Sequence, residues 1–135
     1  MRATDIFFFF DTNVVLYLIS GDSIKADRAE ELIGAGGVIS VQVLNEFASV
    51  ASRKNSMRPS EIREVLSAVR RACSVEPVTL ATHDLALDLV ERVRLSFYDG
   101  LIVAAARLAG CSILYSEDMQ TGRTIEGVTI QNPFA

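Results

Sequence analysis

The apolar residues of this chain fall into short runs that are separated by longer segments of mixed character. The first run, Ile6 to Phe10, is continuous, rich in phenylalanine and too short for a helix. These properties predict a strand that is buried on both faces, as in a parallel sheet. Shorter apolar patterns predict four more strands, at Gly37 to Val41, Val75 to Val78, Ser112 to Tyr115 and Val128 to Gln131.

The segments between these strands predict helices. The first helix is expected to begin at Val14 and to reach Ile19, with Thr12 or Asn13 as its capping residue. Five more are expected at Ser23 to Ala35, Gln42 to Lys54, Ser60 to Cys73, Thr82 to Leu95 and Asp99 to Ala109. Short strands that alternate with longer helices predict an α/β fold with a mainly parallel sheet. We expect residues 55–59 and 120–127 to be the least constrained segments.

Length and composition agree with one globular domain over residues 1–135. A chain of 135 residues, of which 50% are hydrophobic, can bury one sizeable core but not two. Cys73 and Cys111 lie among apolar neighbours without metal-ligand spacing, which predicts buried thiols in a reducing compartment. No apolar stretch reaches the ~18 residues that a membrane-spanning helix needs. The expected location is therefore the cytoplasm.

Acidic residues directly follow two of the predicted strands. Asp11 comes immediately after the first strand, and Ser116-Glu117-Asp118 follows the apolar residues Ile113 to Tyr115. In an open parallel sheet, ligands bind beyond the carboxyl ends of the strands. We therefore expect both acidic groups at the same edge of the sheet.

Two further acids are placed where they can join that edge. Asp99 stands at the head of the segment Leu101 to Ala106, a helix so apolar that it is expected to be buried. Glu46 lies on the helix after the second strand, at the border of its apolar arc. Taken singly, each acid fits a helix cap, a turn or a solvated helix position. Those explanations do not account for all four acids being placeable at one edge of one sheet.

Carboxylates that gather in this way need a counter-charge. Within ~4 to 6 Å of each other they raise one another's pKa unless a positive charge lies between them. No lysine or arginine is adjacent in sequence to any of the four acids. A site made only of oxygen ligands predicts a hard divalent cation, Mg²⁺ or Mn²⁺.

Four segments surround the four acids and together span nearly the whole chain: FFFFDTNVVLYL at the start, SVQVLNEF around Glu46, SFYDGLIVAAA around Asp99 and LYSEDMQTG around Asp118. With these segments, which stand in the family's order, the chain resembles the PIN-domain ribonucleases, and most closely the VapC-type toxins of toxin-antitoxin pairs. The resemblance implies a three-layer fold in which helices flank a central parallel sheet of five strands, in the order 3-2-1-4-5.

The resemblance also implies roles for the site residues. Asp11 and Asp99 are expected to be the central metal ligands. Glu46 is expected to be a ligand or a base that orients water, and Asp118 a ligand of a second site or of the outer shell. The supporting positions are Thr12, Asn13, Ser116 and Glu117. One or two bound ions lower the pKa of a water that attacks a phosphodiester, and the family mechanism implies products with a 5′-phosphate and a 3′-hydroxyl.

Partners are implied by the same resemblance: an RNA substrate, a second copy of the chain in a homodimer, and a cognate antitoxin that covers the acidic groove. The net charge of −4 argues at first against a polyanionic partner. If five of the 17 acids gather in the site, however, the remaining 12 are balanced by 13 basic residues. Arg53, Lys54 and Arg58 are candidate contacts for the RNA backbone, although solvated charges at helix ends explain them equally well.

Two alternative functions remain open. A haloacid-dehalogenase-type phosphatase also begins with a strand that ends in aspartate, but it needs a second aspartate two residues later, where this chain has Asn13. The other alternative is a PIN-like protein-binding module with weak or no nuclease activity, although all four acids are present. The single histidine, His83, is expected on the surface, and the chain lacks the G-x-S-x-G motif of nucleophile-histidine hydrolases.

Overall fold

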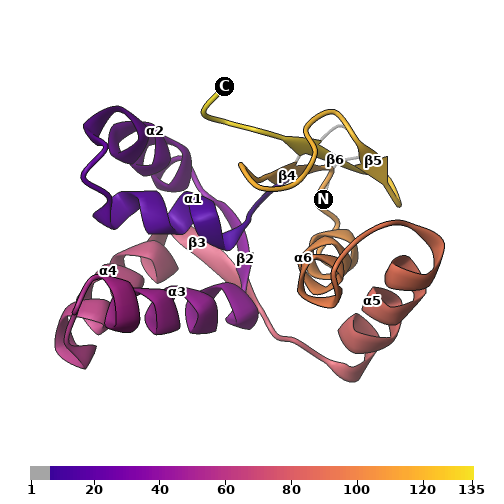
Figure 1. Ribbon diagram of the computed structural model, residues 1–135, viewed down its shortest axis with the longest axis horizontal. Helices are drawn as coiled ribbons and strands as arrows, with labels where there is room; N and C mark the ends of the chain where they lie inside the picture. The colour runs from indigo at the N-terminus through magenta and orange to yellow at the C-terminus, as the bar shows by residue number, and fades with distance from the viewer. Residues whose placement is uncertain (1–6) are drawn as a thin grey trace.

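A six-stranded sheet forms the centre of the computed structural model, which describes residues 7–135 (Figure 1). The strands lie in the order β3-β2-β1-β4-β6-β5. Their bounds are β1 (Phe8–Phe10), β2 (Gly37–Ser40), β3 (Cys73–Glu76), β4 (Ile113–Tyr115), β5 (Thr124–Ile125) and β6 (Val128–Gln131). Every neighbouring pair is parallel except β5 and β6. The carboxyl ends of the parallel strands therefore share one side of the sheet, which we call the carboxyl edge.

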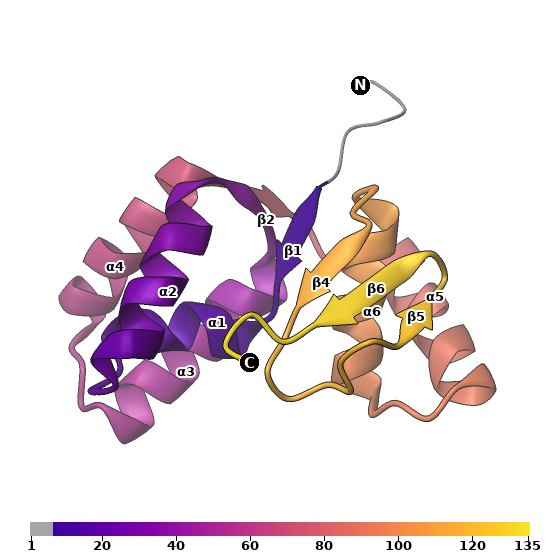
Figure 2. The same cartoon turned by 90° about the horizontal axis from the view of Figure 1, so that it is seen from above.

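The helices cover both faces of this sheet. They are α1 (Thr12–Leu16), the 3-10 helix η1 (Tyr17–Ile19), α2 (Ser23–Gly34), α3 (Val41–Lys54), α4 (Pro59–Ala72), α5 (Leu80–Arg92) and α6 (Phe97–Leu108). In Figures 1 and 2, α1 to α4 lie on one side of the strands, and α5 and α6 pack together on the other. Residues Leu101 to Ala106 of α6 are buried, as the sequence predicted, and so is Gly100.

The structure confirms the α/β class and the predicted order 3-2-1-4-5, because the fifth predicted strand is β6. The five predicted strands pair in parallel, and the structure adds a sixth strand, β5, that the prediction did not include. β5 pairs antiparallel with β6, with Thr124 opposite Thr129 and Ile125 opposite Val128. Glu126 and Gly127 form the connecting turn with φ angles of 52° and 80°, the conformation that joins hairpin strands through two residues. β5 and the turn lie in residues 120–127, which we expected to be among the least constrained.

β1 is packed tightly at the residue before Asp11. The predicted strand began at Ile6, which lies outside the described residues; β1 itself spans Phe8–Phe10. The ring of Phe10 stacks on that of Tyr115 in β4, with centroids 5.9 Å apart. Its other neighbour is Gly37, where an added Cβ would lie 2.5 Å from the Phe10 ring. Gly37, at the start of β2, therefore makes room for the ring of Phe10, the residue before Asp11.

Several helix ends differ from those predicted. α1 is capped by Asp11, whereas Thr12 and Asn13, the predicted caps, lie inside the helix. The prediction failed because the Asp11 carboxylate, directly after β1, already accepts a hydrogen bond from the backbone N–H of Thr12, the first free N–H of the helix. α6 is capped by Ser96, so Asp99 lies in the first turn and not at the head.

Three smaller expectations concern single residues and the membrane. His83 is exposed on α5, and its ring meets the edge of Phe97 with centroids 5.5 Å apart. Cys73 and Cys111 are free thiols and are buried, as expected. Among residues 7–135 there is no helix of the length and apolarity needed to cross a membrane.

Candidate active site

Asp11 is buried at the carboxyl edge, with 7% of its surface exposed. Its backbone N–H donates to the carbonyl of Tyr115 at 3.0 Å and extends the β1–β4 ladder by one residue. Oδ1 accepts from the backbone N–H of Thr12 at 2.8 Å, and Oδ2 accepts from the Ser116 hydroxyl at 2.8 Å. The side chain is therefore both a helix cap and a member of a polar cluster.

Burial perturbs the acids of this cluster. It raises the pKa of Asp11 to about 6, and the charges of Asp99 and Glu46 act in the same direction. Burial also raises the pKa of Asp99, and the charges of Asp118 and Glu46 add to the rise. The four acids predicted to share a site therefore influence one another electrostatically, and the cluster favours either a proton or a cation.

Asn13 and Ser116 tie the loop after β4 to the start of α1. The amide nitrogen of Asn13 lies 3.2 Å from Oδ2 of Asp11 and 3.2 Å from Oδ2 of Asp118. The Asn13 oxygen accepts from the backbone N–H of Glu117 at 3.0 Å. The Ser116 hydroxyl oxygen accepts from the backbone N–H of Asp118 at 3.2 Å. These contacts fix two acids that come from opposite ends of the chain.

Glu46 is held by α1 and by its own helix. The Thr12 hydroxyl donates to Oε1 of Glu46 at 2.7 Å. The amide nitrogen of Gln42, one helical turn earlier, lies 3.4 Å from the same oxygen and 3.2 Å from the carbonyl of Tyr98. Because Tyr98 precedes Asp99, Gln42 connects the Glu46 helix to the helix that carries Asp99.

Gln42 is the site residue that the sequence analysis missed. It is 8% exposed, and its Oε1 makes no hydrogen bond to residues 7–135. The signal was its position four residues before Glu46, which places both side chains on the same helix face. A buried amide so close to a candidate ligand is rarely placed there without polar partners.

Glu117 lies apart from the other acids. Its carboxylate forms an ion pair with Nζ of Lys25 at 2.6 Å and accepts a hydrogen bond from the Tyr17 hydroxyl. The bond from Lys25 is the main reason why the pKa of Glu117 lies below its usual value. Asp118, in contrast, is exposed and is held by Asn13. Of the two adjacent acids, only Asp118 borders the same cavity as Asp11.

That cavity, which we call the acidic cavity, has a volume of about 180 Å³. Four carboxylates line it, from the cap of α1, from α3, from α6 and from the loop after β4: Asp11, Glu46, Asp99 and Asp118. The remaining lining residues are Thr12, Asn13, Leu16, Gln42, Val50, Tyr98 and Ile102. Within the described part of the chain, no lysine or arginine lines it.

The donor set of the acidic cavity fits a hard divalent cation. All its charged groups are carboxylates, which Mg²⁺ and Mn²⁺ prefer. Among residues 7–135, three or more acidic, histidine or cysteine side chains do not meet at metal-ligand distances as they stand. Mg²⁺ usually keeps several waters, and each takes about 30 Å³ of liquid volume, so 180 Å³ accommodates an ion that the carboxylates hold partly through water.

The predicted RNA-binding residues lie outside the acidic cavity. Arg53 and Lys54 are exposed in the last turn of α3, and Nε of Arg53 lies 3.3 Å from the Ser49 hydroxyl. Arg58 precedes α4 and pairs with Glu61 at 3.2 Å. Positive charge at a helix C-terminus is favourable in itself, so contact with RNA remains a prediction for these three residues.

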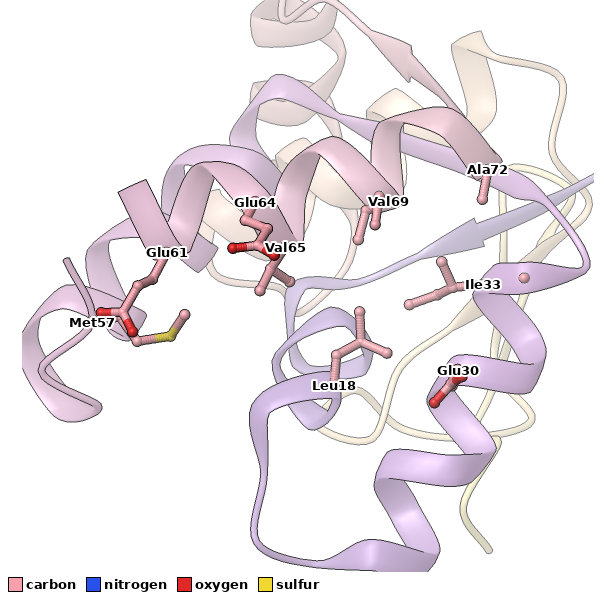
Figure 3. Close-up of a pocket in the computed structure, with 11 residues that line it drawn as sticks. Leu18, Glu30, Ile33, Met57, Glu61, Glu64, Val65, Val69 and Ala72 are labelled. Atoms are coloured by element: carbon pink, nitrogen blue, oxygen red, sulfur yellow. The ribbon is translucent and has the colours of Figure 1, made fainter. Parts of the chain in front are cut away.

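Another concave surface, which none of the four acids of the acidic cavity lines, lies between η1, α2 and α4 (Figure 3). This groove has a volume of about 600 Å³ and an apolar floor that includes Leu18, Ile33, Val65 and Val69. Three glutamates also line it: Glu30, Glu61 and Glu64. We call it the α2–α4 groove.

Comparisons with known proteins place the chain in a family. The model of the PIN domain matches residues 8–124. No curated protein matches the sequence. Residues of three solved structures superpose on most of this chain, each at a sequence identity that speaks for the fold alone.

The first structure is the Mycobacterium tuberculosis toxin VapC20, described as cleaving the sarcin-ricin loop, with 23% identity, coverage of 82% of this chain and 89% of that chain, and a TM-score of 0.66. The second is a toxin-antitoxin complex from Klebsiella pneumoniae, with 22% identity, coverage of 93% and 96%, and a TM-score of 0.70. The third is VapBC2 from Rickettsia felis bound to a promoter DNA fragment, with 18% identity, coverage of 94% and 98%, and a TM-score of 0.65.

Proposed function

Because the chain belongs to the PIN domain family, we propose that it is a Mg²⁺- or Mn²⁺-dependent endoribonuclease and the toxin of a toxin-antitoxin pair. The observation that carries this proposal is the acidic cavity, in which four carboxylates meet without a basic side chain among the described residues. A phosphodiester is itself an anion, so it can approach these carboxylates only if cations neutralise them. This requirement links the metal to the substrate.

The side chains of the acidic cavity have different roles in the proposed reaction. We assign metal binding to Asp11 and Asp99, the two acids whose pKa is raised by burial. When bound, a divalent ion lowers the pKa of a water and offsets charge on the phosphate. Glu46 accepts both of its hydrogen bonds at Oε1, which leaves Oε2 to take a proton from the attacking water. Asp118 serves as a ligand nearer the solvent.

The other polar residues position these acids. Thr12 and Gln42 fix one oxygen of Glu46. Asn13 spans Asp11 and Asp118, and Ser116 donates to Asp11. Asn13 occupies the place where a haloacid-dehalogenase-type phosphatase needs its acid catalyst, and here its amide donates to two carboxylates. The phosphatase alternative is thus the weaker one.

The direct test is cleavage of RNA by the purified chain. We expect cleavage with Mg²⁺ or Mn²⁺, none in chelator, and products with a 5′-phosphate and a 3′-hydroxyl. Asp99→Asn should lose at least about 100-fold in turnover, the scale on which a displaced catalytic group acts, while Asp88→Asn on the exposed face of α5 should match the wild type. Full cleavage by pure Asp99→Asn protein would contradict the assignment.

The two adjacent acids after β4 give a finer test. Asp118→Asn should slow cleavage more than Glu117→Gln, because Asp118 borders the acidic cavity and Glu117 is bound to Lys25. Rates are compared at saturating metal, and melting curves show whether each variant is folded. The reverse order would place Glu117, and not Asp118, at the metal.

The proposal includes partners and a location: an antitoxin, a second copy of the chain and the cytoplasm. We assign a helical segment of the antitoxin to the α2–α4 groove, in addition to the acidic groove that the resemblance implies. The apolar floor of the α2–α4 groove, with Glu30 and Glu64 and with Glu61 already paired to Arg58, fits an amphipathic helix that carries lysine or arginine. A homodimer predicts twice the chain mass in light scattering. A monomer at all concentrations would refute the dimer.

A charge placed in the groove tests the assignment. Ala68 is an exposed lining residue of the groove on α4, and Ser60 is exposed in the first turn of the same helix outside the groove. With a co-expressed candidate antitoxin, Ala68→Glu should lose the complex in gel filtration, and Ser60→Glu should keep it. An intact complex with Ala68→Glu would move the antitoxin to another surface.

A further inference from the structure

Another cavity adjoins the acidic cavity on the side of η1. It has a volume of about 440 Å³. Four residues line both cavities: Asn13, Leu16, Val50 and Asp118. The walls of the second cavity come from α1, η1, the end of α3 and the loops after η1 and β4, and α1 and α3 lie side by side in Figures 1 and 2.

We propose that this second cavity binds the nucleoside next to the scissile phosphate, and we call it the nucleoside cavity. The inference rests on the proposed nuclease function. An RNA strand whose phosphate reaches the acids extends beyond the acidic cavity, and the four shared residues place the nucleoside cavity directly beside it. The nucleoside attached to that phosphate is therefore within reach of the nucleoside cavity.

Size separates the roles of the two cavities. Sites for drug-sized ligands usually have ~300 to 1,000 Å³. At about 180 Å³ the acidic cavity lies below this range and suits a phosphate group with an ion. At about 440 Å³ the nucleoside cavity lies within it and suits a sugar with its base.

Charge points the same way. Of the two carboxylates of the nucleoside cavity, Glu117 is paired with Lys25, and Asp118 also borders the acidic cavity, where we assign it to the metal. Among the described residues that line the nucleoside cavity there is no lysine or arginine, so it offers no cation for a phosphate. Its other lining residues are uncharged.

The uncharged residues that line the nucleoside cavity include both polar and apolar side chains. Asn55 and Ser20 supply an amide and a hydroxyl, and Leu16, Ile19 and Val50 supply apolar surface. A nucleoside presents the matching chemistry, with hydrogen-bonding edges on the sugar and base and an apolar base face.

Gly21 provides a way to fill the cavity without touching the acids. An added Cβ at this position meets no atom within 4 Å, and its backbone is outside the left-handed region. A phenylalanine can therefore be placed there without backbone strain, and its ring competes with a nucleoside for the space. The matched control is Ala35→Phe, at an exposed position just before β2 on the opposite edge of the sheet.

The experiment measures cleavage of a 12-nucleotide single-stranded RNA of mixed sequence. Gly21→Phe should raise KM by about tenfold or more, the loss expected for the contacts of one nucleoside, and Ala35→Phe should not. Mn²⁺ should stabilise Gly21→Phe and wild type equally in thermal melts, because the variant leaves the acids in place. Equal KM values for Gly21→Phe and Ala35→Phe would overturn the proposal and leave the nuclease function intact.

A second measurement is independent of cleavage. Uridine and adenosine 5′-monophosphates, titrated with Mg²⁺ into labelled protein, should shift the backbone amide signals of Gly21 and Asn55 in the wild type. In Gly21→Phe the signal of Asn55 should stay in place. If the wild type cuts no RNA, the proposed function fails, and these spectra still decide whether the cavity takes a nucleotide. Unchanged signals at both residues would exclude it.

Discussion

Asp11→Asn should stabilise the metal-free protein at neutral pH and have little effect in acid. Burial raises the pKa of Asp11 from 3.8 to about 6. Below pH 4 the carboxyl is protonated in both the folded and the unfolded chain, so it costs nothing. Between pH 4 and 6 the folded state holds the proton more tightly than the unfolded state, so stability falls as pH rises. Above pH 6 the full cost of a buried charge is present.

The magnitude follows from the two pKa values. At about 1.4 kcal/mol per pH unit, the ionised Asp11 lowers the free energy of unfolding by ~3 kcal/mol above pH 6. Asparagine removes this charge but cannot accept the Ser116 hydroxyl on its nitrogen, which costs ~1 to 2 kcal/mol. The net gain is ~1 to 2 kcal/mol at pH 7.5, or ~3 to 8 °C in Tm for a domain of this size. At pH 4.5 the stability gained by removing the charge and the stability lost with the Ser116 hydrogen bond nearly cancel.

The assay is thermal melting of both proteins in chelator at pH 4.5 and pH 7.5, repeated with Mn²⁺. Mn²⁺ should raise the Tm of the wild type and raise that of Asp11→Asn less, because a ligand of the folded state adds stability by mass action. Asp88→Asn, an exposed acid on α5, is the control and should change neither curve. A variant that is no more stable than wild type at pH 7.5, with the same metal shift, would show that Asp11 is only a helix cap.

Three more predictions concern residues around the site. Gln42→Leu should weaken Mn²⁺ binding in calorimetry about tenfold, because the link between Glu46 and the carbonyl before Asp99 is lost; unchanged affinity would make Gln42 structural only. Gly37→Ala should lower stability by ~1 to 3 kcal/mol in urea unfolding, because its Cβ overlaps the Phe10 ring, and a neutral effect would show that the ring can move away. Burial raises the pKa of Cys73 to about 11 and that of Cys111 to about 12, so neither should react with iodoacetamide at pH 8 until urea unfolds the chain; rapid labelling of the native protein would contradict this.

The acids could be predicted from the sequence because each lies next to a strong local pattern. Asp11 follows a run of phenylalanines, and Asp99 lies in the first turn of the most apolar helix. Gln42 could not be found in the same way, since its partner is the carbonyl of Tyr98, and a backbone group carries no mark in the sequence. β5 was missed because two residues of strand are too short to show a period, although the following glycine was a usable turn signal.

Glu117 shows a different limit. In the sequence it is as close to Ser116 as an acid can be, and the structure turns it towards Lys25 of α2, 92 positions away. Successive side chains of extended backbone point to opposite sides. Adjacent residues that look equivalent in the sequence can therefore have different neighbours in the fold. Which of two adjacent acids faces a cavity therefore depends on a backbone direction that only the folded chain defines.

The hydrogen bond between Ser116 and Asp11 has a consequence for the protein during its synthesis. The two residues are 105 positions apart, and a ribosome adds ~5 to 20 residues per second. Asp11 is therefore synthesised some 5 to 20 seconds before the strand that completes its surroundings. During translation Asp11 exists without its hydroxyl partner and without the carboxylate of Asp118. The nuclease activity that we propose should therefore be absent until the chain is nearly finished, and a ribosome stalled before β4 should display a fragment that cuts no RNA.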